Sequence, residues 1–199
     1  MNKWKSLAAG ALLALSGLAA SSAQAAIINF DGVEQNTLTP VTIGDYELSG
    51  PAARIVNGQC GVDKPCLALN RHEETQLNKV DDSPFTLEAF WFYLSGEKTE
   101  LTVTTDKGAN VVYKAPTYEH NTGYVIDLTG NALFEDIRWV KFDNTEPEFF
   151  DKNGKLLNAT GNVRIDDLVV STVPVPAAGW LMVAALGGMV AMRRRKTAA

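Results

Sequence analysis

Short runs of alternating apolar and polar residues recur along the middle of the chain. A period of two is typical of a strand with one buried face, and it predicts strands at 27–30, 46–49, 66–69, 85–94, 101–105, 110–114, 124–128, 137–142 and 163–170. Asp106-Lys107-Gly108 predicts a hairpin between two of them. We find no convincing helical period in any window of twelve or more residues. The pattern therefore predicts one all-β domain, an antiparallel β-sandwich that is jelly-roll-like.

The longest predicted strand, 85–94, is apolar on both faces at its centre, where it reads Phe90-Trp91-Phe92-Tyr93. Such a strand is expected in the middle of a sandwich, buried on two sides. Its aromatic side chains have two interpretations, a sugar-stacking platform or ordinary core packing. Core packing is favoured because large aromatic residues are mostly buried.

The N-terminus has the three parts of a secretory signal peptide. Lys3 and Lys5 supply a positive start, 7–20 is apolar, and Ala23-Gln24-Ala25 offers a cleavage site. The alternative is an N-terminal anchor helix, but the apolar run is shorter than the roughly 20 residues that cross a bilayer. The sequence predicts a signal peptide at 1–25.

The C-terminus combines a proline-rich start, a long uncharged segment and a basic end. The segment 177–192 carries no charge, and with 173–176 it reaches the roughly 20 residues of a membrane span. Four cations at 193–196 follow directly, so the C-terminus is expected in the cytoplasm and the domain outside. A buried core helix is the alternative, and the adjacent cations disfavour it. We therefore predict an ectodomain at 26–172 and a tail with a transmembrane helix at 173–199.

This tail resembles the PEP-CTERM sorting signal of Gram-negative bacteria. The resemblance rests on a Pro-containing motif and an arginine cluster: Val173, Pro174, Val175, Pro176, Ala177, Arg193, Arg194 and Arg195. Val175 replaces the usual Glu, as in the variant with Val-Pro-Leu-Pro-Ala at its core, and this leaves the protease subtype open. The resemblance implies an exosortase-type membrane protease as partner, removal of the tail, and display at the cell surface or in the extracellular matrix. Family members often come from bacteria that make exopolysaccharide.

Charge and cysteine content restrict which ligands and which covalent bonds are expected in the ectodomain. It holds all 23 acidic residues and 12 of the 18 basic ones, a net charge of −11. Nucleic acid would be repelled by this surface, whereas divalent cations are compatible with it. Cys60 and Cys66 lie close together in an exported chain, so they are predicted to form a disulfide. A metal site would need further ligands.

Catalytic motifs are absent from the sequence. Neither His72 nor His120 belongs to a recognisable motif, and the chain has no Gly-x-Ser-x-Gly elbow and no phosphate loop. We therefore expect a non-enzymatic protein that binds carbohydrate, with the cell's own exopolysaccharide as ligand. The alternatives are a structural surface protein without a small ligand and a hydrolase with a pair of carboxylates. Exposed aromatics lining a groove, with Tyr118 and Trp139 as candidates, would favour carbohydrate binding.

The two ends of the ectodomain, 27–31 and 165–170, resemble the terminal strands of jelly-roll passenger domains common in this group. That resemblance implies carbohydrate binding and, in many members, a structural calcium between the first and last strands. Asp31 and Asp166 are the candidate ligands here, since Ca²⁺ takes six to eight oxygens. The alternative is that Asp31 caps a turn and Asp166 lies along a strand edge.

Overall fold

The computed structural model describes residues 25–51, 53–60, 65–147, 149–150, 152–153, 156–157 and 161–172. The predicted sorting signal at 173–199 and the predicted signal peptide, apart from Ala25, lie outside the described residues. Within the described part of the chain, no helix is long and apolar enough to cross a membrane. Gln24–Val173 forms one compact unit.

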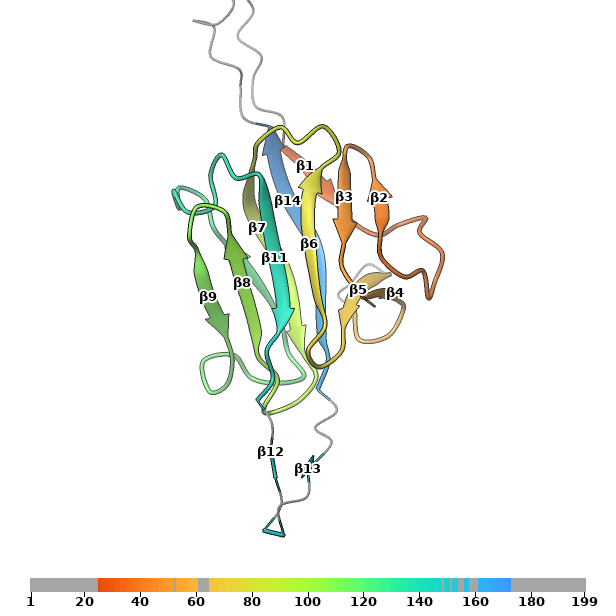
Figure 1. Cartoon of the computed structure of the whole chain (residues 1–199), viewed down its shortest axis with the longest axis vertical. Coiled ribbons are helices and arrows are strands. Elements are labelled where there is room, and N and C mark those ends of the chain that lie inside the picture. The colour runs from red at the N-terminus through yellow and green to blue at the C-terminus, as the bar shows by residue number, and fades with distance from the viewer. Residues whose placement is uncertain are drawn as a thin grey trace, which may run out of the picture. The chain divides into compact units, whose positions relative to one another are not determined.

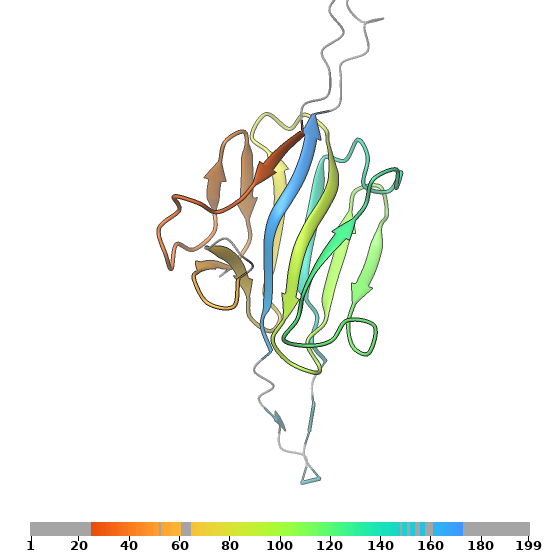
Figure 2. The same cartoon turned by 180° about the vertical axis from the view of Figure 1, so that it is seen from behind.

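Two antiparallel sheets pack face to face in this unit (Figures 1 and 2). Sheet A contains, in order, β10 (Gly123–Asp127), β7 (Phe85–Leu94), β14 (Val163–Thr172), β5 (Cys66–Leu69) and β4 (Arg54–Val56), with β1 (Ala25–Ile28) also paired to β14. Sheet B contains, in order, β2 (Val41–Ile43), β3 (Tyr46–Ser49), β6 (Glu74–Lys79), β11 (Trp139–Asn144), β8 (Leu101–Thr105) and β9 (Asn110–Tyr113). A small hairpin, β12 (Phe149–Phe150) and β13 (Leu156–Leu157), lies between β11 and β14 in the chain. The predicted jelly-roll-like β-sandwich is confirmed.

Alternation along the strands fills the space between the sheets. On β7 the inward side chains are buried, and they are Phe85, Leu87, Phe90, Phe92 and Leu94. The outward side chains of Trp91 and Tyr93 are only half-buried. The expectation that this strand is buried on both sides is therefore met on its inner face alone.

Most of the predicted strands are present, and some have shifted bounds. The strands at 46–49, 66–69, 85–94 and 101–105 have the expected limits, and β8 pairs with β9 in the predicted hairpin. The first strand ends at Ile28 rather than Phe30, and β11 begins at Trp139 rather than Ile137. Three strands of the two sheets were not predicted, namely β2, β4 and β6.

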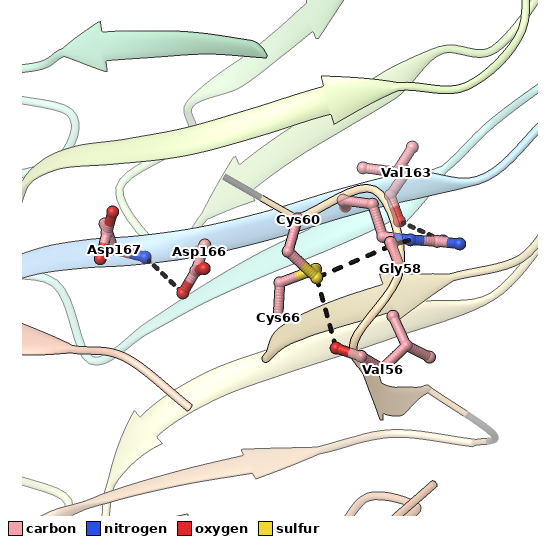
Figure 3. The surroundings of a disulfide bond; sticks show 8 residues. Val56, Gly58, Cys60, Cys66, Val163, Asp166 and Asp167 are labelled. Atoms are coloured by element: carbon pink, nitrogen blue, oxygen red, sulfur yellow. Dashed lines mark hydrogen bonds between the residues drawn. A yellow bond between two sulfur atoms is a disulfide. The ribbon is translucent and has the colours of Figure 1, made fainter. Parts of the chain in front are cut away.

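The predicted disulfide is confirmed, since Cys60 and Cys66 are bonded with their Cα atoms 5.5 Å apart. The Arg164 side chain donates from Nε to the carbonyl of Gly58 at 3.2 Å. Figure 3 shows the loop that carries Gly58 and Cys60 lying beside β14. The bond and this contact together hold the loop at 57–60 against the outer side of sheet A.

Candidate functional site

The outer face of sheet B carries a continuous set of polar side chains. Their strands present them because the intervening residues, such as Leu77, Val140 and Phe142, point into the core. Ten of the outward residues are half-buried: Glu47, Ser49, Glu74, Gln76, Asn78, Thr102, Thr104, Trp139, Lys141 and Asp143. Trp139 is the one aromatic residue among these ten.

Antiparallel pairing arranges these side chains in rows across the strands. Trp139 lies opposite Asn78, and Asn78 lies opposite Glu47. The next row joins Lys141, Gln76 and Ser49 in the same way. Directly opposed side chains on one face lie close enough to act on the same ligand.

Two adjoining depressions follow β6 along this face. The larger has a volume of about 500 Å³ and is lined by Gln76, Asn78, Asp82, Arg138 and Trp139. The smaller has a volume of about 220 Å³ and is lined by Ser49, Gly50, Glu74, Thr75, Gln76 and Lys141. Because Gln76 lines both, we treat them as one feature, the sheet B groove. The volume of the larger depression falls in the range of small-molecule sites, about 300–1,000 Å³.

An ionic cluster lies at the end of the sheet B groove away from Trp139. Lys141 Nζ lies 3.1 Å from Glu74 Oε2, and Asp143 stands directly opposite Glu74 across the strands. Burial raises the pKa of the Asp143 carboxyl, and the charge of Glu74 raises it further, against the opposing effects of Lys141 and His72. The groove thus combines the ring of Trp139 with Asp82 and Arg138 at one end, amides in the middle and an ionic cluster at the other end.

Of the two aromatic residues predicted to bind ligand, Trp139 lines the groove and Tyr118 does not. The Tyr118 ring packs against those of Phe92, Tyr113 and Tyr124, at centroid distances of 5.3, 5.5 and 5.1 Å. It is partly buried against the hydrophobic core. The structure therefore does not bring the two predicted residues into one site.

The residues predicted to hold calcium lie near the neighbouring first and last strands. β1 pairs with β14, with Ile28 opposite Leu168, as the calcium hypothesis requires. Asp31 is exposed in a turn, and its Oδ2 accepts from Asn29 Nδ2 at 3.0 Å. Asp166 is buried on β14, where Oδ1 accepts the Asp167 N–H at 2.9 Å. Among the described residues, no group of three or more His, Cys, Asp or Glu could hold a metal ion. The calcium site stays a prediction.

The fold and the site define a two-sheet β-sandwich with an open polar groove on one outer face. No protein-family model matches the chain, and no curated protein matches it.

Among solved structures, the chain is similar to a family 29 carbohydrate-binding module at 14% identity and TM-score 0.42, covering 75% of this chain and 89% of that one. A family 29 carbohydrate-binding module from Piromyces equi has 9% identity and TM-score 0.41, over 76% of this chain and 92% of that one. A family two carbohydrate esterase from Cellvibrio japonicus has 13% identity and TM-score 0.41, over 77% of this chain and 36% of that one. Because all these TM-scores are below 0.5, the likenesses assign no function to this chain.

Proposed function

We propose that the ectodomain at 26–172 is a non-catalytic carbohydrate-binding module that takes a polysaccharide chain along the sheet B groove. The observation that carries the proposal is the half-buried ring of Trp139 at one end of a groove lined by amide and charged side chains. A sugar ring has a flat apolar face that stacks on an aromatic ring, and its hydroxyls pair with polar side chains. Gln76 and Asn78 each offer both a donor and an acceptor.

A neutral polysaccharide suits this groove better than an anionic one. The lining balances two acidic residues, Glu74 and Asp82, against Lys141 and Arg138, and the adjoining rows add the acidic Glu47 and Asp143. The ectodomain also carries a net charge of −11, so an anionic chain would be repelled on approach.

The place of action in this proposal is outside the cytoplasm. A disulfide-bonded domain fits an extracellular location, because such bonds persist in oxidising compartments. An exosortase-type protease is the proposed partner that reads the tail, after the membrane has held the domain outside. Display at the surface or in the matrix would place the module beside the cell's own exopolysaccharide.

The test is affinity electrophoresis of the 26–172 fragment in gels that contain neutral polysaccharides. We use this fragment because the described hydrophobic core lies wholly within it. Trp139→Ala should weaken retention at least tenfold, since the stacking ring is lost, and Trp139→Phe should keep much of it. Val112→Ala serves as the matched control, because Val112 is an exposed apolar residue on β9 of the same sheet.

If the Trp139→Ala fragment is retained as strongly as the parent fragment, the sheet B groove is not the binding site. If the parent fragment is retained by no polysaccharide, the structural surface role replaces carbohydrate binding.

One observation favours a second candidate, the hydrolase. Asp143 and Glu74 face each other directly, and the pKa of Asp143 is raised. A pair of carboxyl groups at one site is the arrangement that glycosidases use. Release of reducing ends by the parent, abolished in Asp143→Asn, would establish this activity in place of binding alone.

A further inference from the structure

Two aromatic rings are stacked on the outer face of sheet A, the side of the sandwich opposite the groove. Trp91 and Tyr93 project from β7 with ring centroids 6.3 Å apart and planes at 16°. Both are half-buried, whereas Phe90 and Phe92 on the same strand face the core. We call these two rings the Trp91–Tyr93 platform.

The structure fixes both rings in place. A Cβ on Gly123 would stand 2.6 Å from Trp91 Nε1 and 2.8 Å from Cε2, so the indole packs directly against a residue that has no side chain. The Tyr93 hydroxyl donates to Asn121 Oδ1 at 2.9 Å. A ring held in advance loses little conformational freedom when a ligand stacks on it.

The surroundings of the platform combine an apolar surface with charged groups. Val125 lies opposite Trp91 and is 71% exposed, and Asp127 extends the same side of β10. On the other flank, Arg164 lies opposite Tyr93 and is held by the Gly58 carbonyl. Figure 3 shows Gly58 and Cys60 beside β14, so the segment 57–60 borders the platform on that side.

We propose that the Trp91–Tyr93 platform is a second glycan-binding surface, for the apolar faces of successive sugar rings in a neutral polysaccharide. Two rings with nearly parallel planes, in line along one strand, suit an extended chain of flat rings. A second copy of this domain is disfavoured as occupant, because each copy has a net charge of −11 and like charges at an interface repel.

A second surface changes what the module does. The outer faces of sheets A and B point away from each other (Figures 1 and 2), so ligands on them are separate chain segments. With both surfaces occupied, one module crosslinks two polysaccharide segments, and linked sites gain avidity. The inference extends the proposed function, but the platform can bind whether or not the groove does.

The two surfaces have separate fluorescent reporters, because Trp91 and Trp139 are the only tryptophans in 26–172. Trp139→Phe leaves Trp91 as sole reporter of the platform, and Trp91→Phe leaves Trp139 as sole reporter of the groove. Each fragment is titrated with cellohexaose, mannohexaose and xylohexaose. In the Trp139→Phe fragment we expect a saturable change in emission with at least one of them.

Two further changes in the Trp139→Phe background test the geometry. Tyr93→Ala should weaken the titration at least tenfold, and Gly123→Ala should weaken it because the new Cβ displaces the indole. Leu133→Ala is the matched control, since Leu133 is exposed and 44% accessible. The parent, mixed with the matching polysaccharide, should raise viscosity, and Trp91→Ala should abolish this rise while its groove still binds.

Absence of any response in Trp139→Phe overturns the platform as a glycan site, while absence of a response in Trp91→Phe overturns the groove. Self-association of the parent in sedimentation, lost in Trp91→Ala, would assign the platform to a second copy instead and would also overturn the inference.

Discussion

At the scale of single residues, Gly161 has the closest neighbours of the described glycines, namely Thr99 and Glu146. All three are buried. Alanine at 161 would place its Cβ against Thr99 Oγ1 and 2.8 Å from Glu146 Oε2. Gly161→Ala should therefore lower the free energy of unfolding by about 1–3 kcal/mol, the usual cost of overpacking.

Denaturant unfolding of the 26–172 fragment measures this cost, and Thr99→Ala provides the cross-check. In the double variant, removal of the Thr99 hydroxyl and methyl should relieve part of the clash, so the combined loss should be smaller than the sum of the single losses. Gly58→Ala is the control, because nothing lies within 4 Å of a Cβ there. Equal stability of Gly161→Ala and Gly58→Ala would contradict the packing argument.

At the scale of elements, a strand was predictable where its inward positions are apolar. β7 and β8 have that pattern, and their limits matched the prediction. β6 does not, because its inward residues are Thr75, Leu77 and Lys79, and only one of these is apolar. β2 and β4 have three residues each, too few to show a period.

Because β6 was not predicted as a strand, part of the groove lining could not be identified from the sequence. Trp139 was identified as a candidate from its residue type, but its partners Gln76 and Asn78 are on β6. They meet it through pairing between strands that are far apart in the chain. For the aromatic residues of β7 the sequence left two roles open, core packing and a sugar-stacking platform. The alternation of side chains along the strand places Phe90 in the core and Trp91 outside it.

Loss of the disulfide should have mainly local effects on the structure. Cys60 and Cys66 are six residues apart, and closing so small a loop stabilises the fold by about 2–3 kcal/mol. The Cys60→Ser/Cys66→Ser variant should lose that much in denaturant unfolding. Because the disulfide holds the segment 57–60, which borders the platform, binding there should weaken more than binding in the sheet B groove. Equal losses at both surfaces would show that this segment does not support the platform.

At the scale of the whole chain, export and anchoring are predicted to depend on the basic end of the tail. Replacing Arg193, Arg194 and Arg195 by Glu removes the positive charge that keeps this end in the cytoplasm. We expect full-length protein that is misoriented or unprocessed, detected by protease accessibility and by the mass of the mature chain. Replacement of the same residues by Lys keeps the charge and is the control for orientation. Unchanged processing and location of the Glu variant would refute the sorting function of the tail.

The stability of the whole domain should fall steeply at alkaline pH because of two buried tyrosines. Burial, with smaller contributions from Asp45 and Asp81, raises the pKa of Tyr46 to about 12. Burial, with a smaller electrostatic contribution from Tyr118, raises the pKa of Tyr113 to about 12. In the unfolded chain a tyrosine ionises near pH 10.

Between these values the unfolded state has lost protons that the folded state retains, so stability decreases as pH rises from about 10 to 12. Each tyrosine contributes a slope of up to about 1.4 kcal/mol per pH unit. The double variant Tyr46→Phe/Tyr113→Phe removes both ionisations. It keeps the two aromatic rings, which contact Phe85 and Phe90 edge to face with ring centroids 5.5 and 5.7 Å apart. Denaturant unfolding from pH 9 to 12 should therefore give a shallower decline for this variant than for the parent. Parallel curves would mean that the two phenols do not set the alkaline limit of the fold.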